Sequence, residues 1–93
     1  MYYVYLIISE RDGRFYTGCT NNLTARISDH NQGKVRSTTA RKPFRLIYYE
    51  ACVSKQDAFR REKYLKTGRG KRYLRNRLRT TLHTFWPSKL ERP

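Results

Sequence analysis

The feature that most constrains the fold is an apolar segment near the start of the chain, followed by a strong turn signal. Residues 2–8 read YYVYLII, and such β-branched and aromatic side chains favour a β-strand. The pair Asp12-Gly13 is typical of a two-residue hairpin turn, and residues 15–19 (FYTGC) follow it as a second strand. The sequence therefore predicts a β-hairpin at the start of the chain.

The register of this hairpin decides which side chains share a face of the sheet. With a two-residue turn, Arg11 pairs with Arg14, so odd positions of the first strand face even positions of the second. Tyr5 and Tyr16 then point to the same side of the sheet. A three-residue loop or a bulge would send the two phenols to opposite sides.

Capping signals predict the first helix. Thr20 or Asn21 can cap a helix that runs to about Gln32, where Gly33 supplies a left-handed stop. A polar loop over residues 34–43, rich in Ser, Thr, Lys and Arg, separates this helix from the next apolar segment.

The second half of the chain predicts one more strand and two more helices. Residues 44–53 (FRLIYYEACV) form the strand, and Ser54 with Asp57 gives a variant capping box for a helix that ends near Thr67. A last helix spans residue 71 to about 82. We therefore expect an α/β protein of the α+β type, in which helices flank a small three-stranded antiparallel sheet in the order β-β-α-β-α-α.

The length of the chain limits it to one small domain. We assign residues 1–82 to this domain and residues 83–93 to a C-terminal tail. Phe85 and Trp86 are large apolar residues within the tail, so we expect them to dock back onto the domain.

Charge is the most unusual property of the composition. The 93 residues include 21 Lys and Arg but only 7 Asp and Glu, which gives a net charge of +14. Such self-repulsion destabilises a small domain unless an anion relieves it, and nucleic acid is the anion that best matches many Lys and Arg side chains. A merely soluble basic surface and an anionic membrane surface are the alternatives, but the sequence has no apolar stripe suited to membrane insertion.

Secreted, membrane-spanning, zinc-binding and disulfide-linked proteins agree less well with this sequence. The apolar run of residues 2–8 is too short for a signal peptide or a membrane span, so we expect a cytoplasmic protein. Cys19 and Cys52 lack the spacing of a zinc site or of a disulfide framework. No symmetry cue suggests an oligomer, and we expect a monomer.

Several polar side chains fall where a helix should bury apolar ones. At about 100° per residue, Arg26 and His30 share the apolar face of the first helix. Glu62 falls among the apolar residues of the second helix. An arginine and a histidine on an inward face are destabilising without partners, and a carboxylate there needs a cation.

Each of these residues also has an ordinary explanation. A strand tyrosine is most often part of the core, Arg26 can extend its guanidinium to solvent, and His30 can be a hydrogen-bonded residue at a helix end. Glu62 can pair with Lys66, one turn later. Two phenols, an arginine, a histidine and a carboxylate on inward faces together match the groups that phosphodiester hydrolysis needs.

These residues resemble those of the GIY-YIG nuclease family. YVY at residues 3–5 corresponds to the first motif and YTG at residues 16–18 to the second, and the remaining family positions follow at the expected spacing: Arg26, His30 and Glu62. The segment YTGCTNNLTARISDHNQGK is similar to the small stand-alone bacterial members. The resemblance extends from residue 2 to about 79. This part of the chain is also similar to the catalytic domains of the excision-repair nuclease and of structure-specific endonucleases.

The chain departs from the family pattern at two positions. Tyr3 replaces the glycine of GIY, on a strand where backbone freedom is not required. Cys19 stands where the branch with the excision-repair nuclease carries a lysine. The branch that has a histidine four residues after the arginine, as His30 follows Arg26, is therefore the better match.

The resemblance implies metal-dependent hydrolysis and a role for each residue. Glu62 is expected to hold one Mg²⁺ or Mn²⁺ ion, and Arg26 to contact the scissile phosphate. His30 would orient Arg26, a tyrosine or the attacking water. We favour Tyr5 as the general base, with its pKa lowered by the cationic surroundings, and Tyr16 as its partner, although the sequence leaves the reverse assignment open.

Basic residues gather in two segments that we expect to contact nucleic acid. They are Lys34, Arg36, Arg41 and Lys42 in the loop, where Ser37, Thr38 and Thr39 add further contacts, and Lys63, Lys66, Arg69, Lys71, Arg72 and Arg75 in the helical region. This spacing matches neither a helix-turn-helix nor a zinc finger, so we expect the shape of the substrate rather than its sequence to be recognised.

Two functions of different classes fit these observations. The first is a metal-dependent, structure-selective DNA endonuclease in repair or recombination, for which RNA stays open as a substrate and a protein partner as a targeting factor. The second is a basic nucleic-acid-binding module with little turnover. The ordered set of catalytic residues favours the first.

Overall fold

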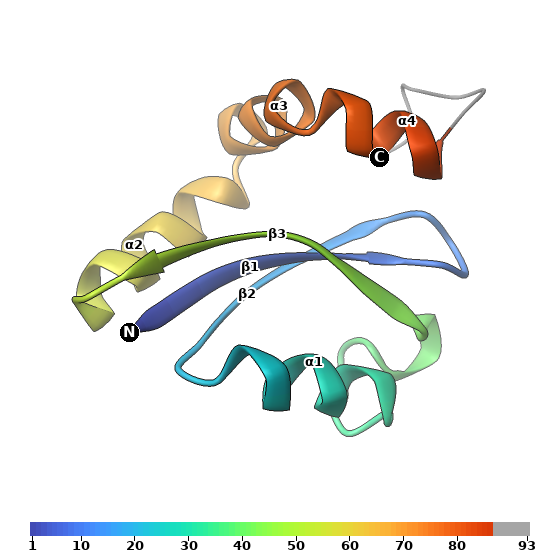
Figure 1. The fold of residues 1–93 in the computed structure, drawn as a ribbon, viewed down its shortest axis with the longest axis horizontal. Coiled ribbons are helices and arrows are strands. Elements are labelled where there is room, and N and C mark those ends of the chain that lie inside the picture. Colours follow the sequence, from blue (N-terminus) through green and yellow to red (C-terminus); the bar gives the residue numbers. More distant parts are fainter. Residues whose placement is uncertain (87–93) are drawn as a thin grey trace.

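The computed structural model describes residues 1–86, which form an antiparallel sheet with helices on both faces (Figure 1). The elements follow in the order β1 (Tyr2–Ser9), β2 (Phe15–Thr20), α1 (Leu23–Asn31), a 3-10 helix (Thr39–Arg41), β3 (Phe44–Cys52), α2 (Lys55–Leu65), α3 (Gly68–Arg77) and α4 (Arg79–Phe85). The predicted α+β fold with a three-stranded antiparallel sheet is confirmed, and a short fourth helix extends the predicted order.

The central strand β1 has a core on each of its faces. β1 pairs with β2 on one side and with β3 on the other, so the strand order is β2-β1-β3. Val4 and Leu6 belong to the core covered by α2, α3 and α4, whereas Tyr5 belongs to the core covered by α1 (Figure 1). Because β1 is buried on both faces, its sequence is apolar almost without interruption.

The hairpin between β1 and β2 has a longer turn than predicted. Ser9 pairs with Arg14, with 3.0 Å between Ser9 N and Arg14 O, so residues 10–13 form the loop and the predicted two-residue turn is wrong. The loop gains an even number of residues, which preserves the parity of the pairing. Tyr5 and Tyr16 therefore both face α1, as predicted.

The N-cap of the first helix lies one residue after the predicted candidates. Asn22 accepts a hydrogen bond from Ala25 N at 3.1 Å, so neither Thr20 nor Asn21 is the cap. Gly33 follows the end of α1 with φ of 77°, which confirms its predicted role as a left-handed stop.

The start of α2 agrees with the prediction, whereas the helical region that follows it divides differently from what was predicted. Ser54 caps α2 as predicted, by accepting a hydrogen bond from Asp57 N at 3.2 Å. Helix α2 ends at Leu65, close to the predicted end near Thr67, and Thr67 itself caps α3, because its hydroxyl accepts from Gly70 N at 3.1 Å. Leu78 separates α3 from α4. Among the described residues, no helix is both long and apolar enough to cross a bilayer.

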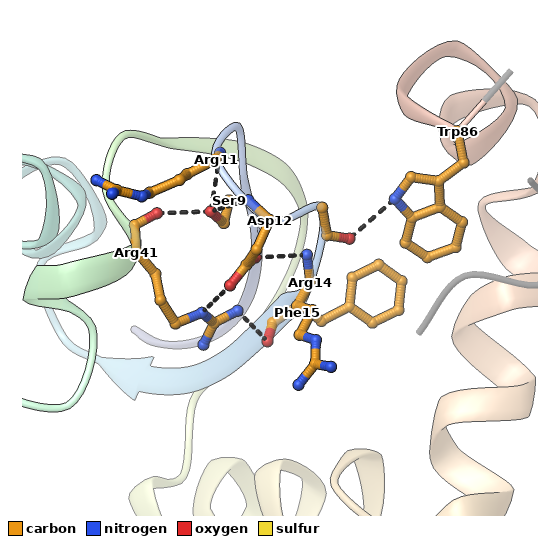
Figure 2. Close-up of polar contacts among 8 residues, drawn as sticks. Ser9, Arg11, Asp12, Arg14, Phe15, Arg41 and Trp86 are labelled. Atoms are coloured by element: carbon orange, nitrogen blue, oxygen red, sulfur yellow. Dashed lines mark hydrogen bonds and ion pairs between the residues drawn. The ribbon is translucent and has the colours of Figure 1, made fainter.

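The end of α4 returns to the hairpin loop. Trp86 is 1% exposed, its ring stacks on Phe15 with centroids 5.3 Å apart, and its indole N–H donates to Gly13 O at 2.8 Å (Figure 2). Phe85 is half-buried against the same core. The expected docking of these aromatic residues is confirmed, and the predicted boundary at residue 82 falls inside α4.

A close contact between β1 and β2 accounts for the glycine of the YTG motif. The strand register pairs Tyr5 with Gly18. A Cβ atom at Gly18 would lie 2.3 Å from Tyr5 Oη and 2.4 Å from Tyr5 Cζ. Only a residue without a side chain leaves room for the Tyr5 ring to lie across β2 in this way.

We predict that Gly18→Ala lowers the free energy of unfolding by about 1–3 kcal/mol, because the added methyl group overpacks the site beneath Tyr5. Gly68→Ala is the control, since a Cβ atom there meets nothing within 4 Å. Urea denaturation measures both variants. Equal stabilities would contradict the close contact.

Candidate active site

Three buried side chains form a hydrogen-bonded chain on the α1 face of the sheet. Tyr5 Oη lies 2.8 Å from His30 Nε2, and His30 Nδ1 lies 2.8 Å from Thr38 Oγ1. The three residues are at most 1% exposed, and they come from β1, α1 and the loop before the 3-10 helix. Both ring nitrogens of the buried histidine therefore have a partner, as a buried imidazole requires.

The direction of these hydrogen bonds follows from the single proton of the Thr38 hydroxyl. Thr38 Oγ1 donates to Val35 O at 3.4 Å, so it accepts from the Nδ1–H of His30. Nε2 is then the unprotonated nitrogen and accepts from the Tyr5 hydroxyl. Burial, together with the positive charge of Arg26, lowers the pKa of His30 to about 4, so the imidazole is neutral near pH 7.

Tyr5 is protonated at neutral pH, contrary to the expectation from sequence. Burial raises its pKa to about 12, although a hydrogen bond from Arg26 acts in the opposite direction. The expectation that cationic surroundings would lower this pKa is wrong, because loss of hydration outweighs the neighbouring positive charge. Tyr5 is therefore a neutral hydrogen-bonding group near pH 7 in this arrangement.

Arg26, on α1, interacts with the Tyr5 end of this hydrogen-bonded row of side chains. Its guanidinium is half-buried, and a hydrogen bond with Tyr5 is the largest cause of the raised pKa of Arg26. The Tyr5 oxygen thus receives a hydrogen bond from Arg26 and donates its own proton to His30. The guanidinium thus lies next to a buried hydroxyl whose position His30 and Thr38 hold.

Tyr16 lies beside this chain but is more open to solvent than Tyr5. Its ring centroid is 5.0 Å from that of His30 and 6.4 Å from that of Tyr5. Tyr16 is half-buried, whereas Tyr5 is 1% exposed. Of the two predicted phenols, Tyr16 is therefore the one that a bound substrate could reach.

Glu62 lies on α2, one of the three helices that cover the other face of the sheet. Its side chain is 22% exposed, and its carboxylate pairs with Lys66 Nζ at 2.9 Å. The ordinary explanation considered for this residue, an ion pair with Lys66, is thus present. The negative charge of Glu62 also contributes to the raised pKa values of Tyr5 and Cys19, which places the carboxylate within electrostatic reach of the cluster.

Two hollows in the surface share the lining residue Phe59, and one of them is lined by Arg26 and the other by Glu62. One has a volume of about 350 Å³, and Arg26, Cys19 and Phe59 contribute to its lining. The other, of about 500 Å³, is lined by Glu62 and Lys63 and again by Phe59. Because Phe59 lines both hollows, the guanidinium and the carboxylate border neighbouring openings in the surface.

The carboxylate of Glu62 fits a hard divalent cation. Within residues 1–86, no group of three or more His, Cys, Asp or Glu side chains could hold a metal ion. Mg²⁺, however, is commonly held by one or two carboxylates together with water and substrate phosphate oxygens. Glu62 is partly exposed beside an open hollow, so its donor atoms suit that mode of binding.

Most of the basic residues predicted to contact nucleic acid are exposed on the surface. They are Lys34, Arg36, Lys42, Lys63, Lys66, Arg69, Lys71, Arg72 and Arg75. Arg41 differs, because it is half-buried and donates to Asp12 and to Phe15 O. Thr38 was expected to contact the substrate, which is wrong because its side chain is 0% exposed and serves His30 instead.

Sequence reasoning missed two contributors to the site. Thr38 completes the chain behind His30, and Phe59 forms the wall shared by the two hollows. Thr38 reaches His30 through a loop whose path no periodic pattern specifies. Phe59 carries a clearer signal in the sequence, since it lies three residues before Glu62 on the same helix, a spacing that places two side chains on one face.

Comparison with known proteins agrees with the motifs. The family described as GIY-YIG catalytic domain matches residues 1–79. A UPF0213 protein of Staphylococcus haemolyticus is 46% identical over 67 residues, which cover 71% of this chain and 80% of that protein. A UPF0213 protein of Clostridium perfringens is 45% identical over 67 residues, covering 71% of each chain.

A solved structure is also similar. The solution NMR structure of a UPF0213 protein from Bacillus halodurans is 40% identical, and the match covers 80% of this chain and 82% of that chain with a TM-score of 0.49. The family match over residues 1–79 and the identity to the curated relatives decide the assignment: this chain belongs to the GIY-YIG family.

Proposed function

We propose that this protein is a metal-dependent DNA endonuclease that hydrolyses phosphodiester bonds and selects its substrate by structure rather than by sequence. The observation that carries the proposal is the hydrogen-bonded chain that holds Arg26 beside a hollow next to the one lined by Glu62. A positioned guanidinium, a phenol open to solvent and a carboxylate suited to a metal ion are the groups that phosphodiester hydrolysis uses.

Arg26 binds the scissile phosphate in this proposal. Its hydrogen-bonding partner Tyr5 is neutral, and Asp29, a carboxylate that acts on its pKa, forms no ion pair with it within residues 1–86, so its positive charge stays available for an anion. The planar guanidinium can donate to two phosphate oxygens, and it would stabilise the negative charge that builds on them during the reaction. Tyr5 and His30 act as positioning residues behind it.

Tyr16, rather than Tyr5, takes the proton of the attacking water. Tyr5 is buried and its pKa is about 12, so it cannot accept a proton near neutral pH. Tyr16 stands next to it at the edge of the cluster, where water and substrate can approach. This reverses the assignment favoured from sequence.

Glu62 would hold one Mg²⁺ or Mn²⁺ ion, with water and phosphate oxygens completing the coordination. Such an ion, when bound, stabilises the charge of the leaving oxygen. Participation in DNA repair or recombination, action as a monomer in the cytoplasm and use of a targeting partner belong to the same proposal. RNA is the second substrate to be compared with DNA.

A basic nucleic-acid-binding module with little turnover is the second candidate. The observation that favours it is the ion pair between Glu62 and Lys66, because a lysine that stays on the carboxylate would compete with a metal ion. The two candidates differ in whether metal-dependent cuts accompany binding.

We predict that Glu62→Gln reduces DNA cleavage in Mg²⁺ to the level that the unaltered protein shows in EDTA, while binding in EDTA persists. The amide keeps the size of the side chain but removes the charge that a metal ion needs. Asp57→Asn is the matched control, because Asp57 is exposed on the same helix and pairs only locally with Arg60. Assays with branched, nicked and linear DNA measure the effect, and full activity of Glu62→Gln would refute the assignment.

The dependence of kcat on pH in variants of Tyr5 and Tyr16 shows which of the two phenols is the base. We predict that kcat of the unaltered protein rises between about pH 6 and 9 and that Tyr16→Phe loses this rise, because the base is gone. Tyr5→Phe should keep the rise at a rate lower by about 100-fold, because Arg26 loses its positioning partner. A Tyr5→Phe variant with a flat profile, beside a Tyr16→Phe variant that keeps the rise, would restore Tyr5 as the base.

The neutral state of His30 predicts how stability depends on pH. The folded protein holds the pKa of His30 at about 4, below its ordinary value of 6.5, so the unfolded chain binds more protons between these values. The contribution is complete above pH 6.5 and is lost as pH falls towards 4, by up to about 3 kcal/mol. Urea denaturation should show this slope in the unaltered protein and not in His30→Gln. A constant free energy of unfolding from pH 7 to about 4.5 would contradict a buried neutral imidazole.

A further inference from the structure

A third hollow, distinct from the two beside Arg26 and Glu62, is lined by several positively charged side chains. Its volume is about 340 Å³, and we call it the basic hollow after its lining residues: Asp12, Arg14, Phe15, Arg41, Lys71 and Arg75. These residues come from the hairpin loop and the start of β2, from the 3-10 helix and from α3. The lining of the basic hollow therefore contains four cationic side chains and one carboxylate.

The hairpin loop fixes one of these cations in place. Arg41 Nε donates to Asp12 Oδ2 at 2.9 Å, and Arg41 Nη2 donates to Phe15 O at 3.2 Å (Figure 2). The Ser9 hydroxyl donates to Arg41 O and accepts from the N–H of Arg11 at 3.0 Å. The guanidinium thus needs little further ordering to bind an anion, which lowers the entropy lost on binding.

The other three cations have no carboxylate partner of their own among residues 1–86. Arg14, Lys71 and Arg75 are exposed, and none of them takes part in an ion pair within this range. Lys71 and Arg75 also lie four residues apart on α3, a spacing at which like charges destabilise a helix. Repulsion within the basic hollow would be relieved by an anion that enters it.

The position of the basic hollow relates it to the candidate active site. β2 is an edge strand, and Phe15 at its start lines the basic hollow. The next residue, Tyr16, lies beside Tyr5 and His30 of the candidate active site. Thr20 at the other end of β2 lines the hollow that contains Arg26. A strand of this length extends about 17–20 Å, so one bound nucleic acid strand could follow the edge of β2 past both sites.

We propose that the basic hollow is a subsite for a backbone phosphate of the nucleic acid, on one side of the bond that is cut. The inference rests on the proposed function for its substrate, but it does not require turnover. Arg14, Arg41 and Arg75 supply planar donors for phosphate oxygens, and Lys71 adds a point charge.

The subsite changes the set of residues expected from sequence. It adds Arg14, which sequence analysis treated only as a hairpin residue. It also divides the basic residues of α3, because Lys71 and Arg75 line the hollow and Arg72 does not. The separation follows from helical geometry, in which residues four apart share a face.

The test compares two double variants that lose the same charge. Arg14→Ala/Arg75→Ala removes two arginines of the basic hollow, and the control Arg11→Ala/Arg79→Ala removes two exposed arginines outside it. The side chains of Arg11 and Arg14 extend in different directions from the hairpin loop (Figure 2). The dissociation constant of a short fluorescent DNA is measured in EDTA over a range of salt concentrations.

We predict that the slope of log affinity against log salt concentration falls in magnitude by about 1 in the Arg14→Ala/Arg75→Ala variant, because one phosphate loses its cationic partners, and changes much less in the control. Equal slopes in the two variants would overturn the inference, as would an unaltered protein that binds no DNA. A basic hollow that bound inorganic phosphate, while the DNA slope stayed unchanged on substitution, would point to a free anion and also overturn it.

Cleavage assays in Mg²⁺ distinguish this inference from the proposed function. DNA that is bound through the basic hollow but never cut would refute the endonuclease and leave the phosphate subsite standing. DNA that is cut by the unaltered protein, with the hollow variant and the control variant behaving alike in binding, would refute the subsite and leave the endonuclease standing.

Discussion

The contact between Tyr5 and Gly18 is the interaction on which the site depends. β1 is buried on both faces, and its Tyr5 ring can lie across β2 only because Gly18 has no side chain. That position brings the phenol hydroxyl to His30, whose other nitrogen is held by Thr38. Arg26 interacts with the same hydroxyl, so the strand pair positions the group that lies next to the candidate phosphate-binding residue.

Burial sets the charge of this group of residues. Loss of hydration raises the pKa of Tyr5 to about 12 and lowers that of His30 to about 4, so both are neutral near pH 7. The guanidinium of Arg26 then carries a positive charge beside these neutral residues, and within residues 1–86 it forms no ion pair. A phosphate is the partner that such an arrangement suits best.

The sequence predicted the parts of the structure that follow from local periodicity. The face shared by Tyr5 and Tyr16, the inward position of His30 and the stop at Gly33 all depend on strand or helix geometry that repeats over a few residues. The role of Thr38 could not be predicted, because an irregular loop carries it to His30. The pKa of Tyr5 was misjudged because neighbouring charges are visible in a sequence, whereas the depth of burial depends on the packed sheet.

The central claim is that Arg26 acts through the position that Tyr5 gives it. The most direct measurement is a double-mutant cycle on DNA cleavage with Tyr5→Phe, Arg26→Lys and the variant that carries both changes. If the two residues act as one unit, the double variant should be about as slow as the slower single variant. Effects on the cleavage rate that multiply in the double variant would show that Arg26 and Tyr5 act independently, and would contradict the account.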